Sequence, residues 1–125
     1  MALVLCAGAD DALQHSRVLI LEQAGHEVIS VKGEQELVAA CQEHQFAVAV
    51  IGQGVPNNEK HRVLRLLKQH CPNAKVLELV ATGAGRVLDG ASDWLEGPVT
   101  APVELARRVS LLASKARLLR FRKAH

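Results

Sequence analysis

The side chains of this sequence best suited to chemistry are its histidines and cysteines, but their spacing matches no catalytic or metal-binding motif. Cys6, Cys41 and Cys71 form no CxxC pair, so they predict separate buried thiols and neither a zinc site nor a disulfide framework. None of the six histidines stands in an HExxH or similar metal-ligand spacing. No nucleophile is paired with a base. The residue types therefore predict a protein that is not an enzyme and that holds no metal or cofactor.

Glycines gather where the predicted strands end. Six of the nine glycines lie at these positions: Gly8, Gly52, Gly54, Gly83, Gly85 and Gly97. The carboxyl edge of an open α/β sheet is where ligands bind, and glycines there expose backbone N–H groups. Two interpretations stay open. One is a disused site that has lost its side chains. The other is a pocket for a nucleotide or other anion, lined by Gly8, Asp10, Gly52, Gly54, Gly83 and Gly97. No complete GxGxxG or Walker motif supports the second.

The elements that position these glycines follow from alternating apolar runs and amphipathic segments, a pattern that predicts a parallel sheet with helices on both faces. Strands are predicted at Leu3–Ala7, Glu27–Val31, Ala47–Ile51, Lys75–Val80 and Asp93–Glu96. Helices are predicted from Asp10 or Asp11 to Gly25, from Glu34 to His44, from Glu59 to His70, weakly around Arg86 to Asp89, and from Pro102 onward. Glu78 interrupts the apolar fourth strand, so it either faces outward or pairs with a cation.

The length and the charge distribution of the chain indicate how it is organised. Its 125 residues, about half of them apolar, predict one domain over 1–125. No apolar run approaches the ~20 residues that span a bilayer, and we expect a cytoplasmic protein. Residues 1–104 hold all thirteen acidic residues and eight basic ones, a net charge of −5. Residues 105–125 carry seven basic residues and no acid, so 115–125 is predicted to be a basic helical extension.

The last helix has a heptad-like apolar stripe with spacings of four, three, four and three. Its members are Leu105, Val109, Leu112, Ala116 and Leu119. The stripe either docks on the sheet or forms a seam with a partner. Trp94, the single tryptophan in a chain with two phenylalanines and no tyrosine, is a candidate interface anchor. The basic extension would suit an anionic partner through its charge, but no recognition helix or base-stacking motif supports sequence-specific nucleic-acid binding.

Three segments resemble parts of bacterial response-regulator receiver domains. Gly25-His26-Glu27-Val28 resembles their second strand, the run from Phe46 to Pro56 their phosphorylation-site strand and loop, and Gly90 to Pro98 the end of the domain. The resemblance covers nearly all of residues 2–114. It implies a flavodoxin-like (βα)5 fold with five parallel strands in the order 2-1-3-4-5, and it places Trp94 on a face that receivers use to dimerise or to bind partners.

The same resemblance shows which chemistry the sequence has lost. Receivers hold Mg²⁺ with an acidic pair, accept a phosphoryl group on an aspartate, and place a switch Ser or Thr and a lysine beside it. The corresponding positions here are Gly8 and Ala9, Gly52, Val80 and Gly97. The resemblance therefore implies a pseudo-receiver that acts through protein association, as a homodimer or with a signalling partner, or as the receiver end of a longer regulator. A small-ligand sensor is the alternative.

Overall fold

The computed structural model describes residues 2–96 and 102–124. The strands are β1 (Leu3–Ala7), β2 (Glu27–Val31), β3 (Val48–Ile51), β4 (Lys75–Val80) and β5 (Asp93–Glu96). The helices are α1 (Asp11–Gln23), α2 (Glu34–Glu43), α3 (Asn57–His70) and α4 (Pro102–Ala124). All strand pairs are parallel, and the strand order is β2-β1-β3-β4-β5. The predicted fold class and order are thus confirmed, and β3 begins one residue later than expected.

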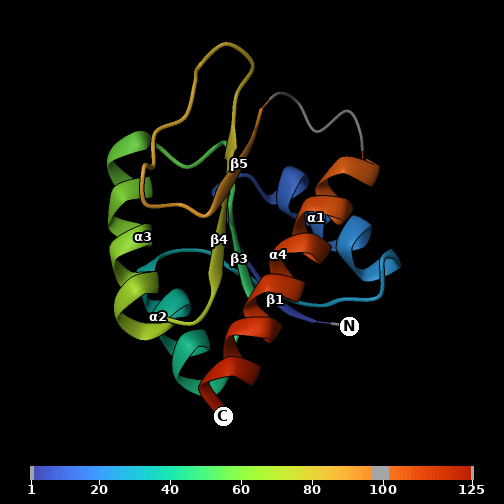
Figure 1. The fold of residues 1–125 in the computed structure, drawn as a ribbon. Coiled ribbons are helices and arrows are strands. Elements are labelled where there is room, and N and C mark those ends of the chain that lie inside the picture. The colour runs from blue at the N-terminus through green and yellow to red at the C-terminus, as the bar shows by residue number, and fades with distance from the viewer. Residues whose placement is uncertain (1, 97–101, 125) are drawn as a thin grey trace.

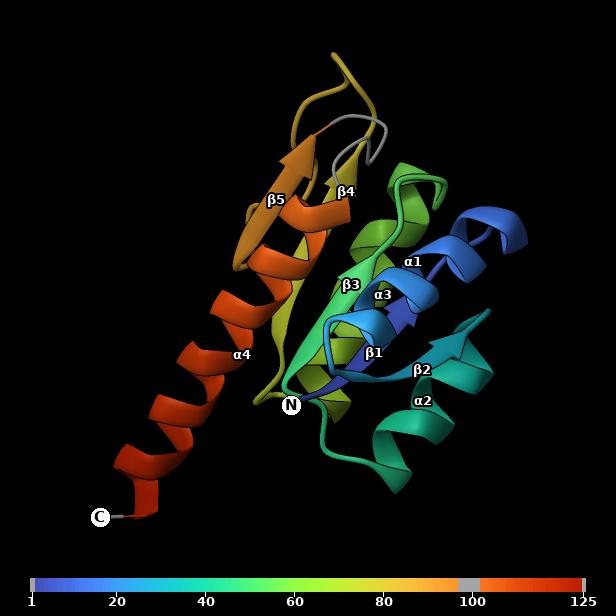
Figure 2. The same cartoon turned by 90° about the vertical axis from the view of Figure 1, so that its right-hand side faces the viewer.

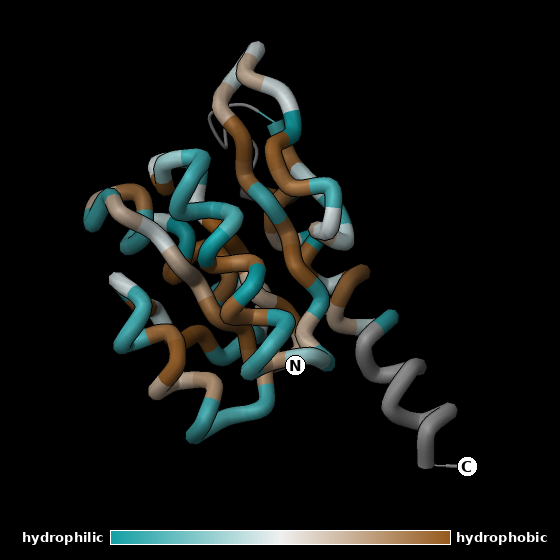
Figure 3. The backbone as a smooth tube through the Cα atoms, turned by 90° about the vertical axis from the view of Figure 1, so that its left-hand side faces the viewer, coloured by the Kyte–Doolittle hydropathy of each residue, from teal (hydrophilic) through white to brown (hydrophobic). Residues whose placement is uncertain are grey.

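Two helices cover each face of the sheet (Figure 1). Leu37 of α2 and Leu67 of α3 are buried on one face, and Leu21 of α1 and Leu105 of α4 on the other. In Figure 3 the strands form hydrophobic stretches in the interior, whereas the helices alternate between hydrophobic and hydrophilic positions. This difference is expected because strands covered on both faces are apolar throughout, while each helix buries only one side. Helix α4 continues past the end of the sheet (Figure 2).

The weak helix predicted around Arg86 to Asp89 is wrong, because residues 81–92 form turns and irregular backbone. Gly83 and Gly85 have φ angles of 79° and 77°, which are left-handed and do not continue a helix. The Arg86 side chain donates to the carbonyl oxygens of Leu88, Asp89 and Ala91 at 3.1–3.2 Å. The Arg86 side chain thus donates to backbone carbonyl oxygens that would accept main-chain hydrogen bonds in a helix. The sheet therefore has no crossover helix between β4 and β5.

The cysteine prediction is only partly correct. Cys6 on β1 is a buried free thiol as expected, but Cys41 and Cys71 form a disulfide across 5.7 Å between their Cα atoms. Cys41 lies on α2, and Cys71 is the C-cap residue of α3, so the bond joins two neighbouring helices. Their sequence separation of 30 carries no spacing signal, because only the packing of α2 beside α3 brings the two cysteines together.

Among the helices described, none combines the length and the apolar character needed to cross a membrane.

Candidate functional site

The glycine-rich edge lies where β1 and β3 run side by side. Ala7 of β1 pairs with Ile51 of β3, so the residues that follow, Gly8 and Gly52, are neighbours at the carboxyl ends of the strands. The chain leaves β1 toward α1 on one face and β3 toward α3 on the other (Figure 2). Such a divergence opens the crevice in which α/β sheets bind ligands. Here the crevice is partly filled by side chains from α1.

Arg17 fills the place that a side chain at position 52 would take. A Cβ atom built on Gly52 would lie 2.6 Å from Nη1 of Arg17 and 3.3 Å from the Ala7 carbonyl oxygen. Arg17 is only 4% exposed, so its guanidinium group lies within the crevice. A glycine at position 52 is what allows this group to approach the backbone. A cationic group therefore occupies the space beside Gly52.

Gln14 fills the equivalent space at position 8. A Cβ atom on Gly8 would lie 2.5 Å from Oε1 of Gln14. The Gln14 Nε2 atom donates to the Cys6 carbonyl oxygen at 2.6 Å and to the Val31 carbonyl oxygen at 3.4 Å. These two bonds fix the amide so that its oxygen faces Gly8, and this oxygen is buried without a hydrogen-bond partner. The first helix thus supplies two polar side chains to the crevice.

The charge of Arg17 is incompletely compensated. It forms no ion pair with any carboxylate whose side chain the structure describes, and its Nη2 atom is buried without a hydrogen-bond partner. Burial lowers the pKa of Arg17, and the charge of Asp10 partly opposes that shift. Burial raises the pKa of Cys6 to about 12, so the thiol is neutral near pH 7 and supplies neither a countercharge nor a nucleophile.

The nearby acids serve structural purposes. Oδ1 of Asp10 accepts a hydrogen bond of 3.0 Å from the Leu13 amide and caps α1. Oδ1 of Asp11 contacts Nζ of Lys32 at 3.3 Å. Within residues 2–96 and 102–124, no three His, Cys, Asp or Glu side chains are placed to share a metal ion. The carboxylates of Asp10 and Asp11 are engaged in the helix cap and the ion pair.

A pocket of about 330 Å³ adjoins the crevice on the face covered by α2 and α3. Gly8 and Ala9 form one wall, Val55 and Leu37 belong to its apolar lining, and Arg62 lies at its charged side. Of the other predicted ligand positions, Gly54 is exposed and Gly83 lies in the turn after β4, away from this pocket. The structure therefore brings Gly8, Asp10, Gly52 and Gly54 to one edge, and Gly97 lies outside the described residues. Val80, which the resemblance aligns with the switch residue of receivers, is buried.

The proposed seam on the last helix is corrected by the packing. Leu105, Val109 and Leu112 are buried in the core that α4 forms with the sheet, so they are unavailable to a partner. The side chains of Ala116 and Leu119 lie outside the described residues. Trp94 on β5 is partly exposed, and it lines a shallow hollow together with Arg108. Leu95 packs toward α4, so Trp94 faces the other side of the sheet, where no crossover helix covers β5.

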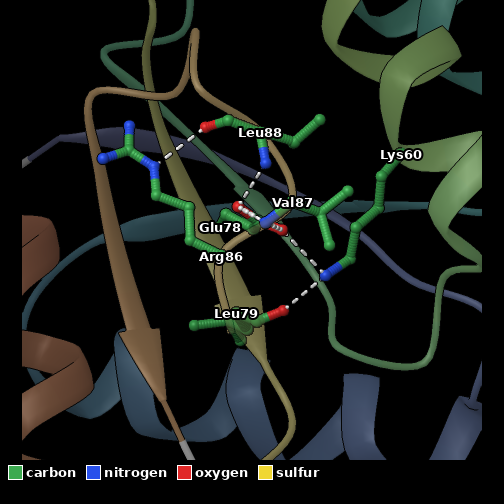
Figure 4. A network of polar contacts seen from close by, with 6 residues as sticks. All are labelled: Lys60, Glu78, Leu79, Arg86, Val87 and Leu88. Carbon is green, nitrogen blue, oxygen red and sulfur yellow. Dashed lines mark hydrogen bonds and ion pairs between the residues drawn. The ribbon is translucent and has the colours of Figure 1, made fainter. Parts of the chain in front are cut away.

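Glu78 forms a buried ion pair that fixes the loop after β4 (Figure 4). Its Oε2 atom contacts Nζ of Lys60 on α3 at 3.1 Å, and Lys60 also donates to the Leu79 carbonyl oxygen at 2.9 Å. The Glu78 carboxylate accepts hydrogen bonds from the Val87 and Leu88 amides at 2.9–3.2 Å. The cation pairing that the sequence offered as one interpretation of Glu78 is therefore confirmed. The pair ties α3, β4 and the loop together.

Solved structures resemble the whole of this architecture. The signal receiver domain of a putative Luxo repressor protein from Vibrio parahaemolyticus superimposes with a TM-score of 0.82 at 18% identity, covering 99% of this chain and 98% of that one. A response regulator receiver domain protein from Clostridium thermocellum gives 0.79 at 21% identity, covering 95% and 99%. The chain has the fold of response-regulator receiver domains.

A larger protein resembles this chain over part of its own length. NtrX from Brucella abortus, solved in complex with ADP, gives a TM-score of 0.83 at 18% identity over 98% of this chain. The receiver-like chain spans only 28% of NtrX. No family model and no curated protein matched the sequence.

Sequence reasoning missed the residues that fill the receiver-like crevice. Gln14, Arg17 and Leu21 are the buried positions of α1, and they recur at the three- and four-residue spacing of one helix face. Polar residues at two of these inward positions were the available signal. Their partners could not be deduced, because the glycines that receive them lie on two other segments of the chain. Lys60 was missed for the same reason, since its partner Glu78 is on a different element.

Proposed function

We propose that this receiver-fold module takes no phosphoryl group and acts by binding another protein. The observation that carries the proposal is the Arg17 guanidinium in the place of a phosphoacceptor side chain at position 52. Glycine offers no nucleophile, and the adjacent acids are occupied as a helix cap and a surface ion pair. Phosphoryl transfer to a carboxylate needs an attacking oxygen and cations arranged around the transferred group. Arg17 supplies a cation at this edge, but position 52 supplies no attacking oxygen.

The association surface that we propose is the β5 edge around Trp94. β5 is the last strand of the sheet, and residues 81–92 leave it without a covering helix. Trp94 is therefore an aromatic side chain beside an open strand edge, a combination that suits both an interface anchor and strand pairing. The occupant we favour is a second copy of the chain, because the acidic charge of residues 1–104 complements the basic charge of residues 105–125 between copies.

Sedimentation velocity over a range of protein concentrations tests this association. The wild-type chain is expected to shift from monomer toward dimer as its concentration rises. Trp94→Ala is expected to raise the dissociation constant about 30-fold, because removing a central aromatic anchor costs about 2 kcal/mol or more. The matched control is Leu19→Ala, which removes a half-exposed apolar side chain from α1, remote from β5. A monomer at every concentration, or a dimer that Trp94→Ala leaves unchanged, would contradict the proposed surface.

A further inference from the structure

The uncompensated Arg17 guanidinium points to a ligand for the crevice. We propose that this edge of the sheet, beside Arg17, reversibly binds a hydrogen-phosphate group, held by the guanidinium without a covalent bond. The inference rests on the proposed absence of phosphoryl transfer, because a covalently modified residue would leave no need for a second phosphate site. It extends that proposal, because it assigns non-covalent phosphate binding to the same edge of the sheet.

The first observation that supports the phosphate site is the buried guanidinium of Arg17, whose Nη2 atom has no partner. A buried charge is stable only when it is paired and hydrogen-bonded, and Nη2 of Arg17 has neither an ion-pair nor a hydrogen-bond partner. The guanidinium is a planar group with five N–H donors that match the oxygens of phosphate. It lies at the divergence of β1 and β3, where the fold places ligands. An oxyanion at this point would supply the missing acceptors and the missing negative charge.

The second support concerns the proton of the ligand. Oε1 of Gln14 and Oε1 of Gln53 are both buried without hydrogen-bond partners, one beside Gly8 and the other on the residue next to Gly52. These atoms can only accept hydrogen bonds. Inorganic phosphate keeps at least one proton at neutral pH, so it can accept from Arg17 and donate to a glutamine oxygen. Sulfate has the same shape but no proton, so the site should select phosphate over sulfate.

Gly54 is the solvent-exposed glycine closest in sequence to Gly52. This residue is exposed, and a Cβ atom built on it would meet only the Cβ atom of Asp10, at 3.9 Å. The Asp10 carboxylate is the nearest acid that acts on Arg17, and its charge opposes the entry of an anion. Asp11 is engaged by Lys32, and Glu34 contacts Arg62, so both of these acids are partly compensated. Asp10 therefore limits the affinity of the site.

Titration of the intact chain with inorganic phosphate tests the inference. Amide resonances are followed by NMR at constant ionic strength, with chloride as the balancing anion. We expect saturable shifts at Gly8, Gly52 and Gly54, a weaker response to sulfate, and no change in intact mass. A phosphomonoester such as glycerol phosphate forms a parallel arm, which distinguishes a free phosphate ligand from an esterified one.

Three variants locate the interaction. Arg17→Gln is expected to raise the dissociation constant at least about tenfold, because a charge-assisted hydrogen bond is lost. Asp10→Asn is expected to lower it severalfold, because asparagine caps a helix as well as aspartate but carries no charge. Arg62→Gln, on the neighbouring pocket, is the control and should leave the constant unchanged.

The outcomes separate the two proposals. Wild-type protein that shows no saturable shift with phosphate overturns the phosphate site, whether or not the variants fold. Equal responses to phosphate and sulfate, or an unchanged constant in a folded Arg17→Gln variant, overturn it as well. A mass increase of one phosphoryl group after treatment with acetyl phosphate contradicts the proposed function and, with it, the basis of this inference.

Discussion

Replacing Glu78 with alanine is expected to lower the free energy of unfolding by about 3–5 kcal/mol, because it leaves the Lys60 ammonium buried without a countercharge. Glu78 is 0% exposed, and its carboxylate also accepts from the Val87 and Leu88 amides. The substitution therefore leaves two backbone donors unsatisfied in addition to the cation. Urea denaturation at neutral pH, followed by circular dichroism, measures the change.

An exposed ion pair in the same chain provides the control. Asp11 and Lys32 contact each other at 3.3 Å with side chains that are 86% and 61% exposed. Asp11→Ala should cost about 0–1 kcal/mol, because solvent screens the pair. Similar losses for Asp11→Ala and Glu78→Ala would contradict the structural role assigned to the buried pair. Faster proteolysis within 81–92 in Glu78→Ala, at a urea concentration where the fold persists, would support it.

Leu105→Ala is expected to destabilise the chain by about 2–5 kcal/mol, the range found when a buried leucine is truncated in a packed core. Leu105 is 0% exposed and packs with Val109 and Leu112 against the sheet. Leu111 on the same helix is 52% exposed, so Leu111→Ala should change stability by no more than about 0.5 kcal/mol. Thermal unfolding of both variants in parallel measures the difference.

The comparison of Leu105→Ala with Leu111→Ala also tests which face of α4 is available to a partner. If the stripe formed a seam between copies, Leu105→Ala would weaken association and leave the unfolding free energy of the monomer nearly unchanged. The packing predicts the opposite, with a loss of monomer stability. Equal effects of Leu105→Ala and Leu111→Ala on stability would contradict the burial of the stripe.

The central strands β1, β3 and β4 could be predicted from the sequence because burial on both faces makes them largely apolar runs. Lys75–Val80 was predicted to the residue despite Glu78, since its neighbours Leu77 and Leu79 preserve the pattern. The segment around Arg86 was misassigned because its conformation depends on Glu78 and on side-chain bonds to its own carbonyl groups. Helix propensity does not include such tertiary contacts.

The position of the candidate site could be predicted from the sequence, but the side chains that occupy it could not. The glycines correctly marked the carboxyl edge, because strand ends can be located from the apolar runs. What occupies the edge depends on the rotation of α1, which turns Gln14 and Arg17 inward over Gly8 and Gly52. The Cys41–Cys71 disulfide depended in the same way on the contact between α2 and α3. Contacts between elements distant in sequence therefore decided each feature that sequence reasoning missed.

The edge of the sheet is proposed not to take a phosphoryl group on position 52. Trp94, the only tryptophan, reports on β5, whose register places it opposite Glu78 of β4. The most direct measurement is therefore Trp94 fluorescence during titration with Mg²⁺ and beryllofluoride, a mimic of the phosphoryl group. We expect no saturable change from a folded sample, because Gly52 offers no carboxylate and Arg17 occupies its place. A saturable change that requires both Mg²⁺ and beryllofluoride would contradict the proposed function and show that an aspartate at this edge serves as the acceptor.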